Sequence, residues 1–246
     1  MALLEARAVS KVFGGLRAVD DVSLSVGEHE LVGLIGPNGA GKTTFFNLIT
    51  GHERPSAGEI LWLGERINGQ MPHVVARRGL VRTFQNPMVF QKISVKDNLS
   101  IAASARKTPL ASGTRNRVIE TCGLQSVLEH TPENLSYGVK RRLGIALAVL
   151  MDPRMLLLDE PAAGLNQTER VQLRELLEAL WKSGLTLVVV EHDMALVMSL
   201  CKRIVVLDAG QLIEDGPPEK VLANPEVARI YLGKAAGRKG GVHAQA

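Results

Sequence analysis

The chain has 246 residues, of which 46% are hydrophobic and 22% charged, a composition typical of a globular protein with a sizeable core. Its apolar runs are far shorter than the roughly 20 residues that cross a bilayer, and its first ten residues do not resemble a secretion signal. The net charge is +4 and aromatic residues are 4%, so basic patches interleaved with stacking rings are missing. We therefore expect no transmembrane segment and no nucleic-acid partner.

The first part of the chain predicts strands and then a strand–loop–helix unit. Residues up to about 30 alternate between apolar and polar in the manner of strands. Residues 31–35 are a short apolar run that suits a fully buried strand. A glycine-rich turn follows, and residues 42–48 have a helical pattern.

The rest of the chain alternates helices with apolar strands. Strands are predicted at 59–63, 80–83, 155–159, 185–190 and 203–207, and helices at 169–182, 193–200 and over much of 86–150. A hairpin turn is expected at 208–210, and the composition after residue 232 indicates a frayed tail. Together these elements predict an α/β fold.

The turn after the first buried strand matches the phosphate-binding P-loop pattern, G-x-x-x-x-G-K-[ST]. Its residues are Gly36, Pro37, Asn38, Gly39, Ala40, Gly41, Lys42, Thr43 and Thr44. Glycines let successive backbone N–H groups face phosphate oxygens, and the following helix presents its positive end to the same anion. Lys42 can reach the β- and γ-phosphates, and the Thr43 hydroxyl can ligate Mg²⁺. The sequence therefore predicts a P-loop nucleotide hydrolase that uses Mg²⁺.

Two adjacent carboxylates, Asp159 and Glu160, lie where the apolar strand predicted at 155–159 ends. Side chains alternate along a strand, so the two can take separate roles where the strand ends. We expect Asp159 to hold Mg²⁺ through a water, and Glu160 to act as the general base that polarises the attacking water.

Further motifs, in the expected order, resemble those of the ABC ATPase family over nearly the whole chain. They are Gln85 in Arg82-Thr83-Phe84-Gln85 (Q-loop), Leu135-Ser136-Tyr137-Gly138-Val139 (signature), Ala162-Ala163-Gly164-Leu165-Asn166 (D-loop), His192 (switch histidine) and Phe13, where the family places an aromatic ring against adenine. The usual first glycine and final glutamine of the signature are replaced here by Tyr137 and Val139.

The resemblance implies a role for each of these positions. Gln85 contacts the Mg²⁺ shell and senses the membrane subunits, and His192 clamps the γ-phosphate and the attacking water. Ser136 and Gly138 bind the γ-phosphate held by the opposite subunit. The implied fold is a RecA-like P-loop core with an N-terminal antiparallel β subdomain and a helical subdomain inserted at about residues 86–150. The ABC ATPase domain is expected over residues 1–233, followed by a disordered tail over 234–246.

The basic run at residues 140–142 follows the signature, where it would lie in the first turn of a helix. Cations are disfavoured there by the helix dipole. Two interpretations remain open: the run meets an anion such as ATP held by a partner, or it is a solvated basic face.

The chain also resembles one subgroup of the ABC ATPases, and this resemblance implies particular partner subunits. The segments 13–19, 161–166, 191–194 and 231–233 resemble the LivG-type ATPases of branched-chain amino acid importers. This implies two integral membrane permease subunits, a second ATPase that is LivF-type or identical, an extracytoplasmic solute-binding protein, and a place at the cytoplasmic face of the inner membrane. Alternatives are importers of urea or amides, and a soluble ABC ATPase acting on ribosomes or DNA. A non-catalytic subunit is disfavoured because Lys42, Glu160 and His192 are all present.

Overall fold

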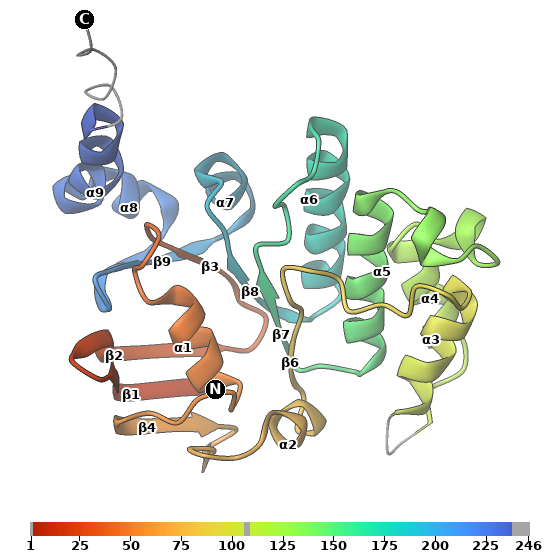
Figure 1. Ribbon diagram of the computed structural model, residues 1–246, viewed down its shortest axis with the longest axis horizontal. Coiled ribbons are helices and arrows are strands. Elements are labelled where there is room, and N and C mark those ends of the chain that lie inside the picture. The colour runs from red at the N-terminus through yellow and green to blue at the C-terminus, as the bar shows by residue number, and fades with distance from the viewer. Residues whose placement is uncertain (1, 106–108, 238–246) are drawn as a thin grey trace, which may run out of the picture.

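The computed structural model describes residues 2–105 and 109–237 (Figure 1). Their strands are β1 (Ala2–Phe13), β2 (Leu16–Gly27), β3 (Leu31–Ile35), β4 (Ala57–Trp62), β5 (Glu65–Arg66), β6 (Leu80–Arg82), β7 (Met155–Asp159), β8 (Thr186–Val190), β9 (Arg203–Asp208) and β10 (Gln211–Gly216). The α-helices are α1 (Lys42–Ile49), α2 (Pro72–Arg77), α3 (Val95–Ser104), α4 (Thr114–Thr121), α5 (Tyr137–Leu150), α6 (Gln167–Lys182), α7 (Met194–Leu200), α8 (Pro218–Ala223) and α9 (Pro225–Gly237).

The N-terminal strands form a small antiparallel sheet in the order β2-β1-β4-β5. This confirms the antiparallel β subdomain expected from the family resemblance. Its apolar residues share one core with helix α1 and with one face of the larger sheet. Helix α1 is therefore held between the two sheets, which places its N-terminus at their junction (Figure 1).

The larger sheet has the order β10-β9-β3-β8-β7-β6, with β10 antiparallel at its edge and the other five strands parallel. Both faces are buried, because Leu31 and Ile35 of β3 pack into one core whereas Val32 and Leu34 pack into the other. Parallel strands end at the same edge of a sheet. The loops after β3, β7 and β8 therefore meet there, although they are far apart in the sequence.

Helices α3, α4 and α5 lie between β6 and β7 in the sequence, within the range expected for the helical subdomain. Figure 1 shows them on the opposite side of the molecule from β1 and β2. Their apolar residues join the core that also contains α6 and α7. None of the described helices is long and apolar enough to cross a bilayer.

Most predicted elements are confirmed within about two residues at each end, but helices α2, α8 and α9 were not predicted. The first residues of these helices are Pro72, Pro218 and Pro225. Proline is well suited to the first turn of a helix, where its missing N–H needs no partner. The predicted tail begins inside α9, which continues to Gly237, and residues 238–246 lie outside the described residues.

Candidate functional site

The P-loop runs from β3 to α1 and is packed tightly against both sheets. Gly41 begins α1 with a φ of 96°, and a Cβ at this position would lie 2.3 Å from the carbonyl oxygen of Ala18 in β2. A Cβ on Gly36 would lie 2.2 Å from the carbonyl oxygen of Leu207 in β9. Only glycine fits at either position, so the loop is fixed against one strand of each sheet.

Lys42 is enclosed by the loop that it follows. Its side chain is buried, and Nζ donates to the carbonyl oxygens of Gly36 at 2.8 Å and Pro37 at 3.0 Å. These contacts hold the ammonium group at the N-terminus of α1, where the helix dipole also favours an anion. This arrangement, with one fixed cation beside a helix N-terminus, is suited to binding a phosphate.

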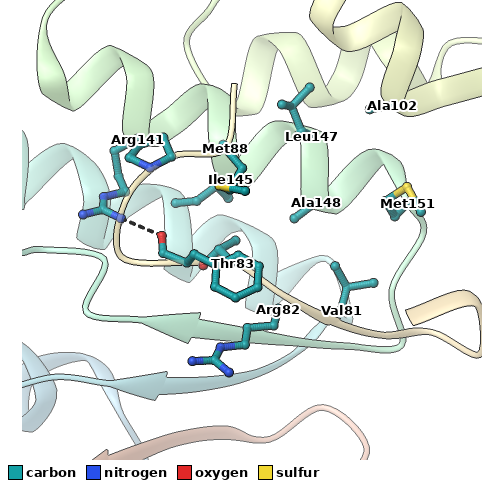
Figure 2. Close-up of a pocket in the computed structure, with 13 residues that line it drawn as sticks. Val81, Arg82, Thr83, Met88, Ala102, Arg141, Ile145, Leu147, Ala148 and Met151 are labelled. Carbon is teal, nitrogen blue, oxygen red and sulfur yellow. Dashed lines mark hydrogen bonds between the residues drawn. The ribbon is translucent and has the colours of Figure 1, made fainter. Parts of the chain in front are cut away.

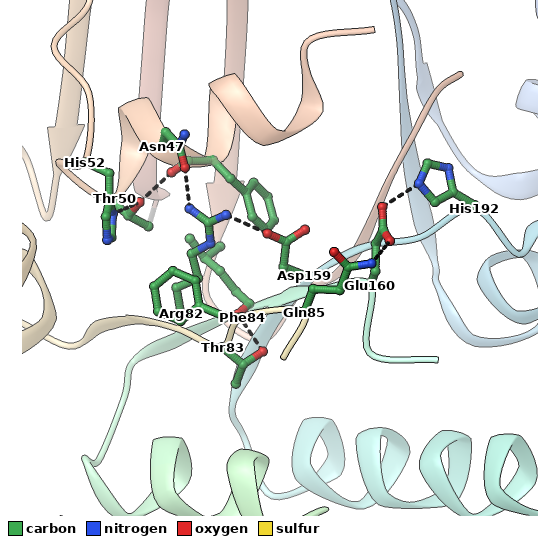
Figure 3. Close-up of polar contacts among 12 residues, drawn as sticks. Asn47, Thr50, His52, Arg82, Thr83, Phe84, Gln85, Asp159, Glu160 and His192 are labelled. Atoms are coloured by element: carbon green, nitrogen blue, oxygen red, sulfur yellow. Dashed lines mark hydrogen bonds and ion pairs between the residues drawn. The ribbon is translucent and has the colours of Figure 1, made fainter. Parts of the chain in front are cut away.

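The predicted general base lies at the end of β7 and contacts two of the predicted site residues. Glu160 has a φ of 46°, a conformation uncommon for a residue with a side chain. Its Oε1 makes a short contact with Nε2 of His192, and its Oε2 accepts a hydrogen bond from Gln85 Nε2 at 3.0 Å (Figure 3). The structure therefore brings together three residues that are separated by up to 107 positions in the sequence.

A cavity of about 650 Å³ lies in front of the P-loop. Its lining includes residues 38–44 together with Glu160 and His192, whereas the predicted site residues Gly36, Pro37, Gln85 and Asp159 do not line it. Sequence reasoning missed four further lining residues: Leu16, Arg17, Ala18 and Ala209. Phe13 pairs with Leu16 across the β1–β2 hairpin and is half exposed, but it does not itself line the cavity.

Ser136 and Gly138 do not line this cavity. Ser136 precedes α5 as its N-cap, and its hydroxyl oxygen accepts a hydrogen bond from the Val139 backbone N–H. A Cβ on Gly138 would lie 2.3 Å from Oε1 of Glu169, a residue of α6 that the sequence did not single out. Within one chain, the signature residues are therefore separate from the P-loop and pack against α6.

For Arg141, the middle residue of the basic run, both interpretations are wrong. It is only 3% exposed, and it donates from Nη1 to the carbonyl oxygen of Phe84 at 3.1 Å (Figure 2) and from Nη2 to the Tyr137 hydroxyl at 2.7 Å. Burial lowers the pKa of this guanidinium. The Tyr137 hydroxyl in turn donates to the carbonyl oxygen of Gln85 at 3.2 Å. The signature helix is thus bonded to the Q-loop of its own chain.

Glu191 is a buried carboxyl that sequence reasoning also missed, because its only sequence signal is its place beside the switch histidine. It is 3% exposed and accepts hydrogen bonds from the backbone N–H groups of Ala162 at 2.6 Å and His192 at 3.2 Å. Burial raises the pKa of this carboxyl above its ordinary value, and the backbone hydrogen bonds oppose that rise. Glu191 links the start of the D-loop to the switch histidine.

The donors near the P-loop suit Mg²⁺ bound together with phosphates. The described residues contain no group of three or more His, Cys, Asp and Glu side chains that could hold a metal ion by themselves. Mg²⁺ instead takes one or two carboxylates with substrate phosphates and water. Thr43 supplies a hydroxyl, Asp159 a carboxylate and Gln85 an amide, all oxygen donors.

Comparison with known proteins supports this geometry. Residues 19–163 match the sequence model of the family described as "ABC transporter". The chain is 41% identical to the high-affinity branched-chain amino acid transport ATP-binding protein BraF of Pseudomonas aeruginosa, with 95% of this chain and 98% of BraF covered. It is 40% identical to the corresponding LivG protein of Escherichia coli K12, with the same coverage. It is 35% identical to the lipopolysaccharide export system ATP-binding protein LptB of E. coli K12, again with 95% and 98% covered.

Solved structures give the same result for the fold. The ADP conformation of MJ1267, an ATP-binding cassette of an ABC transporter, has a TM-score of 0.85 and 28% identity, and the match covers 95% of this chain and 99% of that one. The chain belongs to the ABC transporter family as an ATP-binding cassette, the subunit that binds and hydrolyses ATP.

Proposed function

We propose that this cassette energises the import of branched-chain amino acids, and that its ATP site is the cavity in front of the P-loop. The observation that carries the site is the convergence of Lys42, Glu160 and His192 on one cavity. The cargo is supported by the names of the relatives at 40–41% identity. In this proposal residues 1–233 are the ATPase domain and residues 86–150 its helical subdomain.

Each residue has a defined task in hydrolysis. The P-loop N–H groups and Lys42 bind the β- and γ-phosphates. Thr43, Asp159 and Gln85 would hold Mg²⁺, which would supply positive charge to offset the negative charge that develops during hydrolysis. Glu160 accepts the proton of the attacking water, and its contact with His192 fixes the position of its carboxylate in the lining of the cavity.

The site is completed by a second ATPase subunit, either identical or LivF-type. Support comes from the separation of Ser136 and Gly138 from the cavity of their own chain. Ser136 and Gly138 stand at the N-terminus of α5, which favours an anion, and in the proposal they contact the γ-phosphate bound by the opposite subunit. Closure on ATP and release after hydrolysis then drive the permeases between two states.

Each of the two permease subunits is proposed to dock beside the Q-loop of one ATPase subunit. An apolar cavity of about 230 Å³ lies between the loop after β6 and helix α5 (Figure 2). Phe84 and Met88, which line it, are 39% and 76% exposed, although both are apolar. Because Gln85 follows Phe84 directly, a permease seated there would act on the residue that contacts Glu160. In this proposal the subunit lies at the cytoplasmic face of the inner membrane, below permeases supplied by a solute-binding protein.

Replacement of Glu160 tests the hydrolytic part of the proposal. Glu160→Gln should lower phosphate release by roughly 1,000-fold, because the general base is lost. ATP binding should persist, and light scattering should show a dimer when ATP is present. Glu175→Gln, an exposed carboxylate of α6, is the matched control and should retain turnover. Normal turnover in Glu160→Gln, or a monomer with ATP, would contradict the proposal.

The cargo requires the assembled transporter. Vesicles containing the cassette with its permeases and binding protein should take up leucine, isoleucine and valine in an ATP-dependent manner. Uptake of urea or short amides in place of leucine would reassign the cargo and leave the ATPase intact. Co-sedimentation with ribosomes, without permeases in a pulldown, would instead favour a non-transport ATPase.

A further inference from the structure

Arg82 makes a buried ion pair with the carboxylate assigned to the metal. It is the last residue of β6, and its side chain is 6% exposed. Its Nη2 donates to Oδ2 of Asp159 at 2.5 Å, and its Nη1 donates to Oδ1 of Asn47 at 2.7 Å (Figure 3). One guanidinium therefore joins the end of β7 to helix α1.

Two aromatic rings fix the position of this guanidinium. The Cζ atom lies 5.6 Å from the ring centroid of Phe46 in α1 and 5.1 Å from that of Phe84 in the loop after β6. Arg82 Nε is buried and has no hydrogen-bond partner among the described residues. A buried donor without a partner costs free energy. The two polar partners and the two rings offset that cost and hold the side chain in place.

One polar partner of Arg82 is a predicted Mg²⁺ ligand, and the other lies near a second predicted ligand. Asn47 lies one helical turn beyond Thr43 on α1, and Asp159 is itself a predicted ligand. The ion pair uses one oxygen of the Asp159 carboxylate, and so fixes its orientation. Arginine can hold two acceptors at once because its donors form a rigid planar fork, which lysine lacks.

We propose that Arg82 is a positioning residue that orients Asp159 and sets its place relative to α1 for the binding of Mg²⁺ with ATP. This inference rests on the proposed ATP site. Hydrogen-bond partners of metal ligands affect metal affinity about 10- to 100-fold when they are replaced. Replacing an arginine with a purely structural role would impair folding, or would lower nucleotide affinity equally with and without Mg²⁺. Replacing a positioning residue would lower only the additional affinity that Mg²⁺ provides.

The test compares nucleotide affinity with and without Mg²⁺. A fluorescent ATP analogue is titrated against the isolated subunit in EDTA and in Mg²⁺, and the ratio of the two affinities is the Mg²⁺ gain. In Arg82→Gln the gain should fall about 10- to 100-fold, while the affinity in EDTA stays within about twofold of wild type. Arg82→Lys keeps the charge but not the fork, and should lose most of the same gain.

Arg78→Gln is the matched control. Arg78 lies four residues earlier and pairs with Glu65 at 2.8 Å, outside the site, so the Mg²⁺ gain should not change. If the Mg²⁺ gain of the Arg82 variants equals or exceeds that of wild type, the inference about Arg82 is wrong, but the proposed ATP site is unaffected. Equal loss of affinity in EDTA and in Mg²⁺ would also overturn it, by assigning Arg82 to the fold of the site. A wild type without any Mg²⁺ gain would overturn the proposed ATP site itself.

Discussion

The P-loop region and the signature region contain equally recognisable motifs, but they are organised differently within the chain. The loops after β3, β7 and β8 bring Lys42, Glu160 and His192 to one cavity. Ser136 and Gly138 lie outside that cavity, at the start of α5. One region thus brings its motif residues together within a single chain, whereas the other leaves its motif residues apart from that cavity, which is why we propose that they act against a second chain. Local motifs and parallel strand order are sufficient to predict which residues meet in the P-loop region. They do not predict what the signature residues contact.

The largest expected effect is at Gly41, where the P-loop touches β2. Gly41→Ala should cost about 3 kcal/mol, because the Cβ would meet the Ala18 oxygen at 2.3 Å and because φ is 96°. The melting temperature should fall by about 6–12 °C, and nucleotide binding should be lost. Gly113 is the matched control: it also begins a helix with positive φ, but nothing lies within 4 Å of its Cβ position. A Gly113→Ala loss as large as that of Gly41→Ala would show that strain, not close packing, dominates.

The second-largest effect is expected at Ser136, where hydrolysis should fall without a change in nucleotide affinity. Ser136→Ala should lower ATP hydrolysis about 10- to 100-fold, the value of a lost hydrogen bond to a charged phosphate. The affinity of the isolated subunit for nucleotide should not change, because Ser136 does not line the cavity. Titration and phosphate release measure the two quantities.

Ser94→Ala controls for the lost helix cap. Ser94 is the N-cap of α3 and accepts from the Asp97 N–H, as Ser136 does from Val139 in α5. Both variants should lose about 1 kcal/mol of stability, but only Ser136→Ala should lose hydrolysis. Equal hydrolysis in the two variants would mean that Ser136 has no role in hydrolysis beyond capping its helix.

Particular residues show how far the sequence predicts this structure. Buried strands such as Leu31–Ile35 and Met155–Asp159 were predicted with their final bounds, because short apolar runs between turn residues leave few alternatives. The contact of Glu160 with His192 follows from motif order and parallel topology. Arg141 was misinterpreted, because its sequence context shows a cation near a helix start but not which way the side chain points.

Glu191 and Arg82 show a second limit. Their partners come from separate elements: Glu191 accepts from the Ala162 N–H, and Arg82 pairs with Asp159. No local pattern encodes a contact between residues that lie 29 or 77 positions apart. Supporting contacts around a site depend on tertiary packing, so they were found only in the structure.

The third effect concerns the link between the two regions. Tyr137→Phe removes the hydroxyl that donates to the Gln85 carbonyl oxygen and accepts from Arg141. A net loss of about 1 kcal/mol for hydrogen bonding corresponds to roughly a fivefold fall in kcat, with KM for ATP unchanged. Steady-state kinetics measure both. Arg142→Gln is the control, since Arg142 donates to Cys122 and Gln172 and not to the Q-loop. An equal fall in both variants would show only damage to α5.

The smallest effect is the pH dependence contributed by Glu191, which joins the D-loop to the switch histidine. Burial raises the pKa of its carboxyl above the ordinary value of 4.5, so the folded state holds this proton more tightly than the unfolded state. The stabilisation is therefore complete below pH 4.5 and is lost as the pH rises through the folded-state pKa. Glu191→Gln does not titrate, so the free energy of unfolding of wild type minus that of the variant should decrease from pH 4.5 to pH 8 by about 1.4 kcal/mol for each unit that the pKa is raised. Urea unfolding at both pH values measures this difference. A constant or increasing difference would mean that the N–H groups of Ala162 and His192 outweigh burial, and that the ionised carboxylate itself stabilises the link.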